Sequence, residues 1–165
     1  MLTQSAHAGL WLLVFASPVA LYVAYSDLRS MRIPNVAVLA LLAVYVVVGA
    51  LTLPLTVWAW SWLHFAVVLI IGFVLSLTGG FGAGDAKFAA AMAPFIALGD
   101  LRQFLVLLSA VVIAAFIAHR TLRAVPAIRR ATPGWESWER KEFPFGLALG
   151  PALIFYLGLA CLYGS

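Results

Sequence analysis

The chain has 165 residues, of which 65% are hydrophobic and 10% are charged, with a net charge of +4 and a mean hydropathy of +1.07. This composition excludes an ordinary soluble domain and indicates an integral membrane protein. A bilayer core about 30 Å thick needs roughly 20 apolar residues per helix, so the chain has room for five or six spans. We therefore expect a single membrane-embedded domain over residues 1–165, with no separate soluble domain.

Continuous apolar stretches, each bounded by charge, proline or glycine, predict the membrane spans. In chain order these stretches cover residues 8–25, 36–53, 59–78, 86–98, 103–119 and 144–162. The fourth, at about 13 residues, would rise only about 20 Å as an α-helix, so it must start deep, tilt or fail to cross fully. Because the runs do not alternate, helices are favoured over a barrel. The predicted fold class is all-α, a polytopic bundle of about six transmembrane helices.

The basic residues predict how this bundle is oriented, because Lys and Arg in short loops stay on the cytoplasmic side of the membrane. Only Arg102 falls on the opposite side. The other nine follow the first, third and fifth spans: Arg29, Arg32, Lys87, Arg120, Arg123, Arg129, Arg130, Arg140 and Lys141. Six spans then place both termini outside. The positive charge is explained by topology and by contact with the lipid bilayer, and it gives no reason to invoke nucleic acid.

Few polar side chains are left to support chemistry. Cys161 is the only cysteine, and the histidines lack a companion at ligand spacing, so we expect neither a metal site nor a cofactor. Glu136, Glu139 and Glu142 lie among basic residues in the long loop, where solvated charge pairing is the ordinary role. Asp100 precedes the fifth span, and we expect it to cap that helix.

Asp27 and Asp85 remain, and the predicted topology places both at the cytoplasmic membrane face. Alone, Asp27 could pair with an interfacial arginine and Asp85 could cap a helix beside Lys87. Together they suggest catalysis, because two adjacent carboxylates cannot both ionise easily, so the pair supplies an acid and a base near neutral pH. Gly82 and Gly84, just before Asp85, would let an unwound substrate strand approach closely, through unusual backbone angles or through their lack of a side chain.

Two segments of the sequence resemble the motifs of prepilin peptidases, the Gly-x-Gly-Asp aspartyl proteases of the bacterial inner membrane. The first is Asp27 with Arg29, Arg32, Ile33, Pro34 and Asn35, the second runs from Gly82 to Lys87, and Pro144-Phe145-Gly146 follows later. The resemblance implies that Asp27 and Asp85 are the catalytic pair. It also implies that Gly82, Gly84, Lys87, Pro34 and Asn35 shape the site or contact substrate.

The resemblance further implies a substrate, a type IV prepilin or pseudopilin precursor cut at the cytoplasmic face after a short basic leader, and a link to the pilus-assembly machinery. Larger relatives carry a cytoplasmic insertion with paired Cys-x-x-Cys motifs and methylate the new terminus. This chain has only residues 26–35 between its first two spans, so it resembles the compact peptidases of tight-adherence (Flp) pilus systems, and methyl transfer is not expected.

Other functions stay open from the sequence. A small transporter could bind a cation or relay protons through Asp27 and Asp85, although the predicted spans contain few further polar residues. A non-catalytic membrane partner in pilus assembly is the second alternative. Presenilin-like proteases share the Gly-x-Gly-Asp element, but they resemble one another in a Tyr-Asp pair deep within a span, whereas here Ser26 precedes Asp27 and Arg29 places it near the interface.

Overall fold

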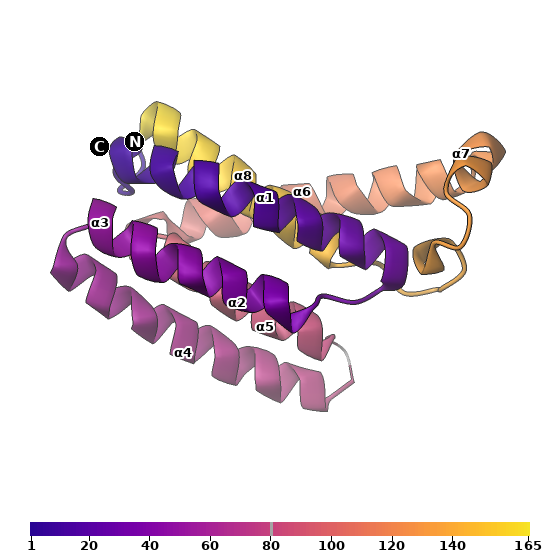
Figure 1. Cartoon of the computed structure of the whole chain (residues 1–165), viewed down its shortest axis with the longest axis horizontal. Coiled ribbons are helices and arrows are strands. Elements are labelled where there is room, and N and C mark those ends of the chain that lie inside the picture. Colours follow the sequence, from indigo (N-terminus) through magenta and orange to yellow (C-terminus); the bar gives the residue numbers. More distant parts are fainter. Residues whose placement is uncertain (80) are drawn as a thin grey trace.

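The computed structural model describes residues 1–79 and 81–165, which form helices joined by short connections (Figure 1). In chain order these are α1 (Ala6–Ser30), α2 (Asn35–Val44), the π-helical turn η1 (Tyr45–Gly49), α3 (Ala50–Thr52), α4 (Leu55–Leu77), α5 (Ala83–Met92), the 3₁₀ turns η2 (Ala93–Phe95) and η3 (Leu98–Asp100), α6 (Leu101–Arg123), α7 (Pro126–Ala131), the 3₁₀ turn η4 (Glu136–Trp138) and α8 (Gly146–Tyr163). No strand occurs in the described part of the chain, which confirms the all-α class.

Five stretches are long and apolar enough to cross a bilayer, and they match the first, second, third, fifth and sixth predicted spans. They cover Ala6–Ser30, Asn35–Thr52, Leu55–Leu77, Leu98–Arg123 and Gly146–Tyr163. The second span is built from α2, η1 and α3 in direct succession, so its middle contains a π turn. Many large apolar side chains point outward from these helices, as in a bundle whose solvent is lipid.

The fourth predicted span is the short one. Helix α5 has ten residues, or about 15 Å, and η2 adds only three more before the backbone extends at Ile96. Pro94 lies in η2 and has no N–H to continue an α-helix. Residues 83–100 still run from one end of the bundle to the other, but through α5, η2 and η3 instead of one long helix (Figure 1).

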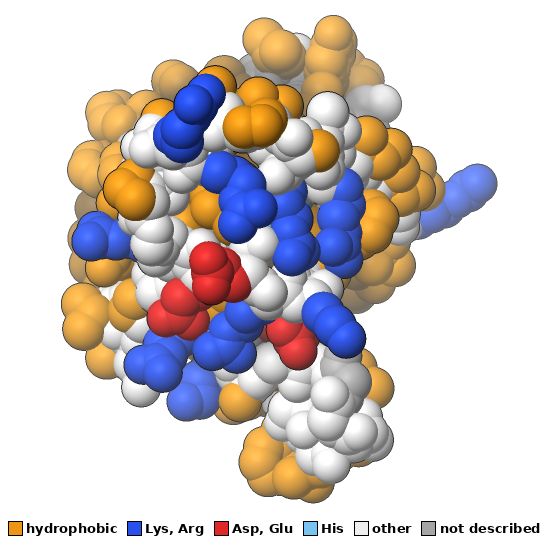
Figure 2. All heavy atoms as spheres, turned by 90° about the vertical axis from the view of Figure 1, so that its right-hand side faces the viewer, with side chains coloured by type: hydrophobic (Ala, Val, Ile, Leu, Met, Phe, Trp, Pro, Cys, Tyr) orange, Lys and Arg blue, Asp and Glu red, His pale blue; other side chains and the backbone are white. Residues whose placement is uncertain are grey.

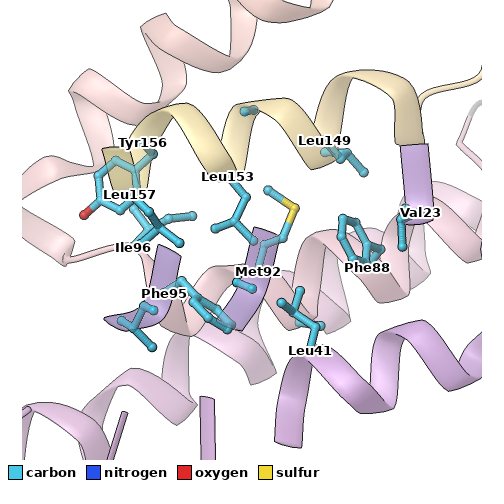
Figure 3. Packing of buried hydrophobic residues seen from close by; sticks show 14 of the residues in the cluster. Val23, Leu41, Phe88, Met92, Phe95, Ile96, Leu149, Leu153, Tyr156 and Leu157 are labelled. Carbon is cyan, nitrogen blue, oxygen red and sulfur yellow. The ribbon is translucent and has the colours of Figure 1, made fainter. Parts of the chain in front are cut away.

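The core lies where α1, α2, α5 and α8 meet. Helices α1 and α8 pack along their lengths, α5 packs on α4 and α2, and α6 packs on α8. Figure 3 shows Phe88 and Met92 of α5 between Leu41 of α2 and Leu149 and Leu153 of α8. Small residues allow these close contacts: at Gly150 of α8 an added Cβ would collide with the carbonyl oxygen of Ala20 in α1.

The two termini lie at the same end of the bundle (Figure 1), where the N–H of Leu2 donates to the carbonyl of Tyr163 at 3.1 Å. The predicted role of Asp100 is wrong at this end. Its fully buried carboxylate makes no capping bond to α6, although it occupies the N-cap position. Instead it accepts hydrogen bonds from the N–H and hydroxyl of Thr3 (both 2.7 Å), the N–H of Gln4 (3.0 Å) and the hydroxyl of Tyr156 (2.9 Å).

The opposite end carries most of the charge. It is formed by the last turns of α1 and α6, the first turns of α2, α5 and α8, and the α6–α8 connection with α7. Figure 2 looks onto this end and shows blue Lys and Arg side chains surrounding the red acidic ones. The structure therefore separates a polar, mainly basic end from the end that holds the termini.

Candidate active site

Asp27 lies in the last turn of α1, at the charged end of the bundle. The helix ends just beyond it, because Met31 adopts a left-handed conformation with φ of 50° and its N–H donates to the carbonyl of Asp27. Only 5% of Asp27 is exposed. Its Oδ2 accepts a hydrogen bond of 2.7 Å from the N–H of Gly146, the first residue of α8. The side chain thus joins the end of one helix to the beginning of another.

Asp85 lies in the first turn of α5, directly after the glycine-rich segment. Gly82 is the N-cap residue, with φ of −66° and ψ of 136°, so no unusual backbone angle requires glycine there. The limit there is space, because a Cβ on Gly82 would collide with Oδ2 of Asp85 and the carboxyl group would have to move. A positive φ occurs nearby at Gly79 (74°). Gly80, which belongs to the same segment, lies outside the described residues.

Asp27 and Asp85 line one cavity of about 490 Å³ at the charged end. Its walls come from α1, the α4–α5 connection, the start of α5 and the residues before α8: Asp27, Met31, Gly79, Phe81, Gly82, Asp85, Arg140, Glu142, Phe143 and Phe145. Burial raises the pKa of Asp85, and the neighbouring carboxylate of Asp27 raises it further, to about 7. The cavity therefore holds a carboxyl group that keeps its proton to near-neutral pH.

The other predicted site residues lie beside this cavity and do not line it. Lys87 Nζ donates to Asn35 Oδ1 at 3.3 Å, which connects the beginning of α5 to that of α2. Pro34 is the N-cap residue of α2. A Cβ on Gly84 would lie 3.5 Å from the Cβ of Ile33, an ordinary van der Waals distance. The hydrogen bond between Lys87 and Asn35 thus links α5 to α2, whereas Gly82 borders the cavity itself.

Several cavity residues were not expected from their own sequence context. The rings of Phe81 and Phe145 meet edge to face at 5.4 Å across the cavity wall. The Pro144-Phe145-Gly146 motif marked Phe145 and Gly146 in the sequence, but it did not predict the hydrogen bond from Gly146 to Asp27. Arg140 had no such signal, because charged residues in a basic loop are usually solvated.

The type IV leader peptidase family matches this chain over residues 13–119, about two thirds of its length. No match is found among curated proteins or among solved structures. The matched segment contains both cavity aspartates and the glycine-rich run, and it ends before the loop that brings Arg140 and Glu142 to the cavity. The chain belongs to the type IV leader peptidase family, and its membership points to an aspartic peptidase of the membrane.

Proposed function

We propose that this protein is an aspartic endopeptidase that removes the short basic leader of type IV prepilin-like precursors at the cytoplasmic face of the bacterial inner membrane. The observation that carries the proposal is that Asp27 and Asp85, 58 positions apart in sequence, line one cavity. The cavity opens at the charged end of the bundle. Nine of the ten basic residues belong to the helix ends and connections that form this end. By the positive-inside rule this end faces the cytoplasm.

The two aspartates have different surroundings, and this difference supports different roles. A backbone N–H can only donate, so the hydrogen bond from Gly146 suits Asp27 as an ionised carboxylate that accepts. The pKa of Asp85, raised to about 7 by burial and by Asp27, suits it as the protonated partner. We therefore assign Asp27 as the general base and Asp85 as the general acid.

The proposed reaction needs only these two groups and one water molecule. Asp27 takes a proton from water as the water oxygen attacks the scissile carbonyl carbon, and Asp85 gives its proton to the carbonyl oxygen. Collapse of the resulting gem-diol breaks the C–N bond. The leaving nitrogen then receives the proton held by Asp27, and Asp85 recovers a proton from a diol hydroxyl. Both carboxyl groups return to their starting states, with no covalent intermediate.

The alternatives have less support. A transporter that used Asp27 and Asp85 would need polar groups continuing through the bundle. Among the described residues, the centre between the two ends is filled by apolar side chains such as Phe88, Met92 and Leu153. Asp100, the buried carboxylate at the far end, is already fully bonded to protein groups. A non-catalytic role in pilus assembly would leave the paired aspartates and their cavity without a purpose.

The proposal is tested by co-expressing the protein with a prepilin of a tight-adherence system and measuring leader loss. Asp27→Asn and Asp85→Asn keep the side-chain shape but cannot exchange the required proton, so each should lower the cleavage rate by at least about 100-fold. Glu139→Gln, an exposed carboxyl change outside the cavity, should cleave like the wild type. Substantial leader removal by either asparagine variant at equal membrane abundance would refute the assignment of the pair.

A further inference from the structure

Residues 140–145, here called the strap, are the last part of the connection between α6 and α8 and contribute four residues to the cavity wall. Two arginines in the last turn of α6 form hydrogen bonds with the first two residues of the strap. Arg120 Nη2 donates to the carbonyl of Lys141 at 3.0 Å, and Arg123 Nη1 donates to the carbonyl of Arg140 at 2.8 Å. The backbone just before Glu142 is thereby fixed to a membrane-spanning helix.

The residue after Glu142 is fixed as well. The ring of Phe143 packs edge to face against Phe116 of α6, with centroids 5.6 Å apart, and against His119 at 5.9 Å. It also meets Phe145 at 6.4 Å. Glu142 therefore lies between two anchored residues, so the backbone that carries its exposed side chain is fixed at the cavity wall.

The loop before the strap is packed against α6 through Trp138. Trp138 is buried, with 5% exposed, and its ring stacks on His119 at 5.1 Å. Its indole N–H donates to the hydroxyl of Thr132 at 2.9 Å. The loop is thus packed onto α6 before the strap begins.

The charges near the strap are unequally paired. Arg140 forms an ion pair of 3.2 Å with Glu136, so much of its charge is balanced within the loop. In the part of the chain that the structure describes, Glu142 forms no ion pair. The basic side chains around this end would repel a cationic peptide (Figure 2), and Glu142 is the acidic cavity residue closest to solvent, since Asp27 is buried and Asp85 is half-buried.

We infer that Glu142 determines leader specificity: its carboxylate binds a Lys or Arg side chain of the leader while the scissile bond lies between Asp27 and Asp85. This inference rests on the proposed function. Glu142 lies nearer to solvent than Asp85 and Asp27 do. This arrangement fits the substrate, because the leader remains on the charged side of the membrane while the scissile peptide bond must reach the deeper aspartates. Arg120 and Arg123 act as positioning residues, through the strap.

The test uses purified full-length protein in detergent and three precursors that differ only in the leader, whose basic residues are kept, changed to Gln or changed to Glu. Glu142→Gln should raise KM for the basic leader about fivefold, the scale of one exposed ion pair, with little change in kcat. It should leave cleavage of the Gln leader unchanged, which shows that the variant is folded. Glu142→Lys should cleave the basic leader less well still and the Glu leader better than the wild type does.

Glu139→Gln is the matched control, since Glu139 is an exposed glutamate in the same loop but outside the cavity lining. Equal KM values for Glu142→Gln and Glu139→Gln with the basic leader would overturn the role of Glu142. The proposed function would survive that result if Asp85→Asn still abolished cleavage. Failure of the wild type to cleave any of the three precursors would overturn both the inference and the proposed function.

Discussion

Gly82 and Gly84 differ in what surrounds the side chain that each lacks. A Cβ at position 82 would collide with Oδ2 of Asp85, and a Cβ at position 84 would only touch Ile33 at 3.5 Å. We expect Gly82→Ala to displace the Asp85 carboxyl and lower the cleavage rate by about tenfold or more, because the proposed general acid would then lie out of position. Gly84→Ala should retain most of the activity.

Leader cleavage by the two alanine variants, normalised to membrane abundance, measures this difference. The pair is matched, since both changes add one methyl group to the same turn. Equal activity in the two variants would show that the contact between position 82 and Asp85 does not matter for the reaction. The sequence predicted one role for both glycines, close approach of the substrate. The structure instead distinguishes them, because only position 82 lies against the Asp85 carboxyl.

The sequence predicted the aspartates of the site but not their partners. Asp27 and Asp85 were identifiable because carboxylates are rare within apolar spans, and that signal is local. The Gly146 N–H that binds Asp27 comes from 119 positions away, and every residue except proline offers the same backbone donor. Asp100 was misassigned for the same reason: its position before α6 suggested a cap, whereas its donors come from both ends of the chain.

At the scale of elements, the contact between α1 and α8 holds Asp27 against Gly146. Gly150 lies one turn further along α8, where an added Cβ would collide with the carbonyl oxygen of Ala20. We expect Gly150→Ala to force the helices apart and destabilise the protein by about 1–3 kcal/mol, the usual cost of overpacking. The separation should also lengthen the Asp27–Gly146 hydrogen bond and lower activity.

Gly158, in the same helix, provides the control, because a Cβ there would have no neighbour within 4 Å. Gly158→Ala should leave activity unchanged and stabilise the helix slightly, since alanine has the higher helix propensity. Thermal unfolding in detergent measures both variants. A melting temperature for Gly150→Ala equal to that of the wild type would contradict the close contact at Ala20.

Hydropathy predicted the long helices well, because each is a continuous apolar run bounded by charged residues, proline or glycine. The sequence also predicted that α5 is short, since residues 86–98 are too few to cross a bilayer as a helix. The π turn at Tyr45–Gly49 could not be predicted. Its five residues are as apolar as the α-helical residues beside them, so composition cannot separate the two hydrogen-bonding patterns.

At the scale of the whole molecule, the proposed orientation places Ser30 and Ala83 in the cytoplasm and Arg102 outside. Single cysteines at these positions, in a Cys161→Ser background, report the side through an impermeant thiol reagent applied to intact spheroplasts. We expect only Arg102→Cys to react before the membrane is opened, because the positive-inside rule retains the basic end in the cytoplasm. Ser137 would be a poor probe, since it is fully buried.

Labelling of Ser30→Cys or Ala83→Cys from the outside would reverse the orientation and remove the leader from reach of the aspartates. Reaction of all three cysteines after the membrane is opened is the control for accessibility. Labelling of none of them, even then, would mean that these ends are covered by a partner or by lipid.

The hydrogen bonds of Asp100 can form only when segments far apart in the sequence have come together. Thr3 and Gln4 are synthesised before Asp100, and Tyr156 is synthesised after it. A nascent chain that lacks α8 thus has a carboxylate short of one donor, in an apolar setting where a missing donor is costly. Synthesis of α8 supplies that hydroxyl, so a chain that contains this helix differs from one truncated before it in the bonding of a single buried carboxylate.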